Sequence, residues 1–163
     1  MADLWFRVKV RMTGLLWRAA GPVRRIYWRV VRPRTQGVKC IVMYENEVLL
    51  VRLNYAHRRW TLPGGGVGRR ESLKEAVIRE VLEETGVAIP DAAKVTEYVT
   101  TAEFKFDTVH VFHASLERKP EPRADGIEIA EAAWFAANRL PSNRVARLEP
   151  LIALVRGSPA EER

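Results

Sequence analysis

Three glutamates in one short stretch are the residues of this chain best suited to chemistry. Glu80, Glu83 and Glu84 are spaced i, i+3 and i+4, so on a helix their carboxylates project from one face. Carboxylates that close repel one another, and a helix gains no stability from gathering them. A hard divalent cation such as Mg²⁺ prefers oxygen ligands and bridges phosphate groups. The spacing therefore predicts a metal site that faces a phosphorylated substrate.

We expect these glutamates to lie on a helix that begins after Ser72 and ends near Gly86. Ser72 and Glu75 form a capping-box pattern, in which each side chain accepts a hydrogen bond from a backbone N–H of the first turn. Gly86 stands where a C-terminal glycine is favoured, and Pro90 prevents continuation. The apolar face that this helix should turn to the core comprises Leu73, Val77 and Val81, widened by Ile78 and Leu82.

Strands are expected on both sides of this helix. Two apolar runs, residues 38–44 and 48–53, flank a short polar turn, which is typical of a β-hairpin. Further strands are predicted at residues 60–62, 94–103, 108–117 and 129–135, and a last helix at residues 142–155. Strands, a helix, more strands and a helix indicate an α/β fold with a mixed sheet between helices.

Charge is distributed unevenly along the 163 residues. Residues 1–40 hold ten basic residues and one acidic residue, a net charge of +9, whereas residues 41–163 hold 17 basic and 19 acidic residues, a net charge of −2. The basic pI of about 10.0 therefore gives no reason to expect the body to bind nucleic acid. We assign residues 1–36 to a basic, aromatic-containing arm, residues 37–157 to the domain that carries the three glutamates and residues 158–163 to a tail.

Residues 65–87 read GGVGRRESLKEAVIREVLEETGV. The spacing from Gly65 through Glu71 to the segment REVLEE and Gly86 resembles the signature box of the Nudix hydrolases, and a chance match is on the order of one in a million. The preceding LPGGG and the later EAAWF followed by LP also resemble that family. The resemblance covers roughly residues 37–155 and implies a Nudix-type α/β/α sandwich.

Resemblance to this family implies a set of metal ligands and their support. Glu80, Glu83 and Glu84 would hold Mg²⁺ or Mn²⁺ as catalytic carboxylates, together with a backbone carbonyl of Gly64 or Gly65. Glycines allow this close backbone approach because they lack a Cβ. Arg79 is expected to pair with Glu71 and to orient the carboxylates. Without metal, at least one of the crowded glutamates should have a raised pKa.

A general base outside the box is also expected. Glu128 is the first candidate and Glu131 the second, with Glu103 a weaker one, although each alone is typical of an ordinary surface residue. Arg52, Arg58 and Arg59 could grip phosphates, with solvated loop charges as the alternative. Trp60, Tyr55 and Phe104 could stack on a base, with a place in the core as the alternative.

The activity implied is hydrolysis of a diphosphate bond, with a nucleotide-type small molecule as substrate. We favour a nucleoside diphosphate linked to another moiety, such as the sugar nucleotide ADP-ribose. The enzymatic alternatives are a house-cleaning nucleoside triphosphate pyrophosphatase and an enzyme that removes 5′-terminal phosphates from RNA. The non-enzymatic alternative is a nucleotide-binding module, which would bind without turnover.

The arm has three possible partners. It could be a helix that packs on its own body or a homodimer partner, a membrane contact of residues 1–34 through tryptophans and arginines, or, with least support, a contact with nucleic acid. Equal liposome binding with and without residues 1–34 would refute the membrane hypothesis. The chain holds no run of 18 apolar residues, and its single cysteine, Cys40, is expected in the core. We therefore expect a cytoplasmic protein, peripheral to a membrane if the arm binds one.

Overall fold

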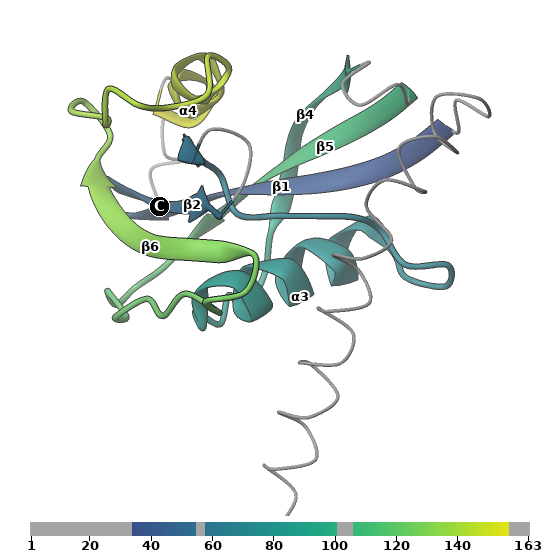
Figure 1. The fold of residues 1–163 in the computed structure, drawn as a ribbon, viewed down its shortest axis with the longest axis horizontal. Coiled ribbons are helices and arrows are strands. Elements are labelled where there is room, and N and C mark those ends of the chain that lie inside the picture. The colour runs from purple at the N-terminus through teal and green to yellow at the C-terminus, as the bar shows by residue number, and fades with distance from the viewer. Residues whose placement is uncertain (1–33, 55–57, 101–105, 157–163) are drawn as a thin grey trace, which may run out of the picture. The chain divides into compact units, whose positions relative to one another are not determined.

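The computed structural model describes residues 34–54, 58–100 and 106–156 (Figure 1). Two compact units are distinguished: residues 1–35 with 99–107, and residues 36–98 with 108–163. In the first, the Thr35 hydroxyl donates a hydrogen bond to Asp107 over 2.7 Å. The arm's expected helix and partners lie outside the described residues, so the homodimer and membrane contacts stay predictions.

Six strands and two helices make up the described chain. In order they are β1 (Arg34–Tyr44), β2 (Glu47–Leu53), β3 (Trp60–Thr61), α3 (Leu73–Thr85), β4 (Ala93–Thr100), β5 (Phe106–Ser115), β6 (Ile129–Ala136) and α4 (Leu148–Arg156). The sheet order is β3-β2-β1-β5-β4, with β6 paired to β2. Figure 1 shows α3 below the strands and α4 above them, so the predicted α/β sandwich is confirmed.

The first hairpin opens soon after its turn, and this opening positions the site. β1 pairs with β2 at Met43↔Val48 and Tyr44↔Glu47, while β6 runs along the whole other side of β2. β3 pairs with the end of β2. Downstream of β3, the backbone follows β1, since the N–H groups of Val38 and Cys40 donate to the carbonyls of Gly65 and Pro63. Residues 60–67 thus form a wedge between the parted strands.

α3 begins and ends as its sequence predicts. Ser72 and Glu75 form the capping box, and Gly86 caps the C-terminus in a left-handed conformation with φ 67°. Val77 and Val81 are fully buried against β1 and β5. The expectation for Leu82 was wrong, because its side chain is 49% exposed and the buried stripe is narrower than predicted.

α4 begins at Leu148, six residues later than the prediction. The intervening segment pairs with β3 instead of coiling, because the Trp60 N–H donates to the Asn143 carbonyl and the Val145 N–H donates to the Trp60 carbonyl. Tertiary hydrogen bonds therefore delay the helix, and Pro150 falls in its first turn, where proline is tolerated. Neither helix of the described part of the chain is long and apolar enough to cross a membrane.

Candidate functional site

Two glycines of the wedge bring backbone into close contact with a strand and a helix. Gly64 has φ 140°, and a Cβ on it would lie 2.1 Å from the Val38 carbonyl oxygen. A Cβ on Gly65 would lie 2.6 Å from the carboxylate of Glu80. Gly64 requires glycine because its neighbour is backbone and its φ is positive, whereas a side chain at Gly65 would displace the Glu80 carboxylate. The loop backbone is thereby pressed between β1 and the acidic face of α3.

Glu84 is the most buried member of the acidic cluster, at 8% exposure. Its carboxylate accepts a hydrogen bond of 2.8 Å from the Gly64 N–H. Burial raises the pKa of Glu84 to about 7, against the opposing effects of Lys39 and the Gly64 N–H. Burial also raises the pKa of Glu80, against the effect of Arg79. A raised pKa was expected from the crowding of the carboxylates, but its main cause is burial, and the neighbouring glutamates contribute less.

Arg79 is the hub of the rest of the cluster. Its guanidinium donates two hydrogen bonds to Glu71, of 2.7 and 2.9 Å, so the predicted pair is present. It also donates to Glu80 over 2.8 Å, to Glu83 over 3.0 Å and to the Gly66 carbonyl over 3.1 Å. Arg79 and the Gly68 N–H hold the pKa of Glu71 near 2. Arg79 therefore makes more contacts than the predicted pair with Glu71, because it also donates to two of the three glutamates.

In the part of the chain that the structure describes, the three glutamates have two partners between them. Glu84 turns to the Gly64 N–H, whereas Arg79 contacts one oxygen each of Glu80 and Glu83. Within the described residues, no three acidic, histidine or cysteine side chains form a ready-made metal-binding group. The donor types nevertheless fit a hard divalent cation, because all are carboxylate or carbonyl oxygens beside a cradle that a Cβ would fill.

The candidate carbonyl ligands differ in their existing partners. The Gly65 carbonyl accepts the sheet-like hydrogen bond from Val38. The Gly64 carbonyl lies 3.4 Å from the amine nitrogen of Lys39, which also donates to the Leu62 carbonyl over 2.8 Å. Sequence reasoning missed Lys39, although a lysine between buried Val38 and Cys40 was a visible signal.

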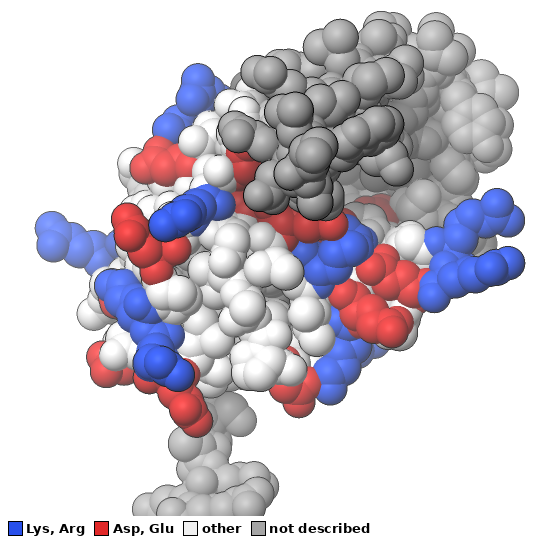
Figure 2. Space-filling view, turned by 90° about the horizontal axis from the view of Figure 1, so that it is seen from below, with Lys and Arg blue, Asp and Glu red and all other residues white. Residues whose placement is uncertain are grey.

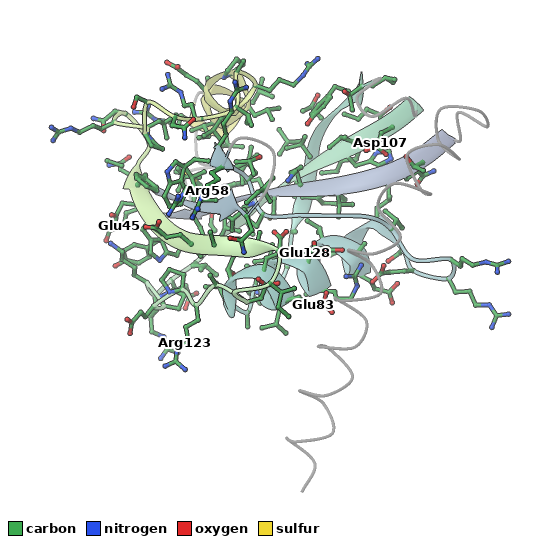
Figure 3. All side chains as sticks on the ribbon, in the orientation of Figure 1. Glu45, Arg58, Glu83, Asp107, Arg123 and Glu128 are labelled. Carbon is green, nitrogen blue, oxygen red and sulfur yellow. The ribbon has the colours of Figure 1, made fainter. Side chains whose placement is uncertain are left out.

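Glu128 lies near enough to the cluster for its charge to contribute to the raised pKa values of Glu80 and Glu84. Figure 3 shows it at the start of β6, on the side of the sheet that faces α3. Asp125 shapes this loop by accepting hydrogen bonds from the N–H groups of residues 127, 128 and 129. The Asn54 N–H donates to the Glu128 carbonyl over 2.8 Å. Neither the contacts of Asp125 nor the contact of Asn54 was predicted from the sequence.

Glu131 is engaged elsewhere. It lies opposite Arg52 in the β2–β6 register and forms an ion pair of 2.6 Å with it. A register irregularity between Arg52 and Leu53 separates this pair from the loop of Glu128. The geometry therefore favours Glu128 over Glu131 as a base. Glu103 lies outside the described residues.

The remaining substrate candidates are divided between core and surface. Trp60 is 8% exposed and packs edge-on against Phe135, with ring centroids 4.7 Å apart, and the Arg52 guanidinium lies 5.8 Å from its ring centroid. Its placement matches the core alternative better than base stacking. Arg58 and Arg59 are exposed, as expected for loop charges. Tyr55 and Phe104 lie outside the described residues.

The surface seen from below in Figure 2 mixes both signs of charge. Lys and Arg are interspersed with Asp and Glu around an area of uncharged residues. This mixture agrees with the small net charge of residues 41–163. On this face, the described surface lacks the continuous basic stripe that nucleic-acid binding favours.

Known proteins resemble this chain in sequence. The NUDIX domain model matches residues 33–155. A Bacillus subtilis (strain 168) protein named as a proposed 8-oxo-dGTP diphosphatase is 39% identical over 108 residues, which are 66% of this chain and 70% of that protein. A second protein of that strain, with the same activity in its name, is 33% identical over 86 residues, 53% and 52% of the two chains.

Solved structures give the same result. The MutT NUDIX hydrolase of Burkholderia pseudomallei superposes with a TM-score of 0.67 at 25% identity, over 75% of this chain and 98% of that one. The fold, the box of residues 65–87 that includes α3 and the match over residues 33–155 agree. The chain belongs to the NUDIX family, the hydrolases that act on diphosphate bonds.

Proposed function

We propose that this chain is a divalent-cation-dependent nucleoside triphosphate pyrophosphohydrolase, releasing a nucleoside monophosphate and pyrophosphate. The observation that carries the proposal is the buried carboxylate of Glu84 hydrogen-bonded to Gly64, beside Glu80 and the glycine cradle. Its triphosphate substrate is supported by the activity named for both Bacillus subtilis relatives. Nothing among the described residues favours a sugar nucleotide, so the proposal moves from ADP-ribose to the triphosphate alternative.

The chain's own residues would divide the work as follows. Glu80, Glu83, Glu84 and the Gly64 carbonyl would hold Mg²⁺ or Mn²⁺. When bound, such a cation polarises phosphoryl oxygens and lowers the pKa of coordinated water. Arg79 keeps Glu80 and Glu83 oriented from the Glu71 side. The Glu128 carboxylate is exposed to solvent, so it can accept the proton of the attacking water.

Substrate screening tests this proposal. The chain is incubated with dGTP, 8-oxo-dGTP, ADP-ribose, a dinucleoside polyphosphate and triphosphorylated RNA, each with Mg²⁺, with Mn²⁺ and with EDTA, and the products are identified by chromatography. The expected result is cation-dependent formation of nucleoside monophosphate and pyrophosphate from a triphosphate. Preferred cleavage of ADP-ribose would instead identify a sugar nucleotide as the substrate. Binding of nucleotides without turnover under either metal would support the binding-module hypothesis instead.

A further inference from the structure

Lys39 is partly exposed and places a positive charge beside the buried residues of β1. Its chain neighbours Val38 and Cys40 are 1% and 0% exposed. Its amine donates to the Leu62 carbonyl over 2.8 Å and to the Gly64 carbonyl over 3.4 Å. Taking an ammonium group out of water is costly unless hydrogen bonds and opposite charges compensate it. Two neutral carbonyls supply part of that compensation.

The remaining compensation comes from the acidic face of α3. Burial lowers the pKa of Lys39, whereas the charges of Glu84 and then Glu80 act in the opposite direction. In return, the charge of Lys39 favours the ionised form of Glu84. The charge of Lys39 and the charges of the two carboxylates therefore favour one another's ionised forms, while the direct contact of Glu84 is with the Gly64 N–H.

We propose that Lys39 is a positioning residue and the built-in counter-cation of the metal site. It fixes the Gly64 carbonyl and balances the carboxylates while it weakens the binding of a divalent cation. The Gly64 carbonyl, which would face such a cation, already accepts from the ammonium over 3.4 Å, so two positive charges would lie beside the same oxygen. This inference rests on the metal site of the proposed function.

Cation binding by the full chain tests the inference without turnover. Mn²⁺ is titrated calorimetrically into metal-free wild type, Lys39→Gln, Lys39→Arg and the control Lys119→Gln. Glutamine keeps an N–H donor for the Leu62 carbonyl but removes the charge, whereas arginine keeps the charge. Lys119 pairs with Glu47 on the surface, at 42% exposure. We expect Lys39→Gln to bind Mn²⁺ about tenfold more tightly, and Lys39→Arg and Lys119→Gln to stay within about twofold of wild type.

The outcomes separate the two proposals. Wild type that does not bind Mn²⁺ overturns the metal site itself and the role of Lys39 with it. Wild type that binds, with Lys39→Gln binding equally or more weakly, overturns the counter-cation role alone. Lys39→Met, similar in length and uncharged, gives the same test if the glutamine variant does not fold. Thermal unfolding is a second readout, in which Mn²⁺ should raise the Tm of Lys39→Gln and Lys39→Met more than that of wild type.

Discussion

Replacing Glu84 by glutamine should stabilise the metal-free protein at neutral pH. The ordinary pKa of this carboxyl is 4.5, and burial raises it to about 7 in the folded chain. Because the folded state holds the proton more tightly than the unfolded state, stability is greatest below pH 4.5 and is lost as the pH rises through 7. A difference of about 2.5 between the two pKa values corresponds to a loss of about 3 kcal/mol in the free energy of unfolding above pH 7.

Glutamine removes this cost because it never ionises, and its amide oxygen can still accept the Gly64 N–H. Urea unfolding in EDTA should therefore show Glu84→Gln about 3 kcal/mol more stable than wild type at pH 8 and about equal to it at pH 4. The corresponding rise in Tm at pH 8 is on the order of 10 °C. Glu83→Gln is the matched control, because its side chain is 60% exposed and should change stability little. A Glu84→Gln variant no more stable than wild type at pH 8 would refute the reasoning.

Three further predictions concern the groups around the cluster. Gly64→Ala should lower the free energy of unfolding in urea by about 3 kcal/mol or more, because its Cβ would collide with the Val38 carbonyl. Gly66→Ala is the control, because a Cβ there meets nothing within 4 Å. Equal losses in the two variants would contradict the close contact between residue 64 and β1. Glu71→Gln should be less stable than wild type above about pH 4.5. The difference in stability should shrink as the pH falls toward 2, because protonation of Glu71 weakens its ion pair with Arg79 in the wild type. An undiminished difference at pH 2 would argue against a stabilising ion pair. Asp125→Ala should lower kcat about tenfold by loosening the loop of Glu128. An unchanged kcat would contradict the positioning of Glu128 by Asp125.

Local features of α3 could be predicted from the sequence because their causes are local. The capping box of Ser72 and the left-handed Gly86 depend on residues within one turn of each helix end. The pairing of Arg79 with Glu71 follows from their spacing across the start of the same helix. Together with the glycines ahead of the helix, these residues were enough to indicate the site.

Features that depend on contacts between distant segments could not be predicted in this way. The amine of Lys39 meets the carbonyls of Leu62 and Gly64 because the wedge follows β1, and no local pattern records that path. α4 starts late because Trp60 hydrogen-bonds Asn143 and Val145. Glu128 stands out from Glu131 once the β2–β6 register pairs Glu131 with Arg52.

Steady-state kinetics of Glu83→Gln and Glu84→Gln test most directly whether catalysis depends on the glutamates of α3. Both variants are assayed with the substrate found by screening, at saturating Mg²⁺, after circular dichroism has shown that each is folded. We predict that each substitution lowers kcat by at least about a hundredfold. Wild-type kcat in both variants would contradict the assignment of the active site to this cluster.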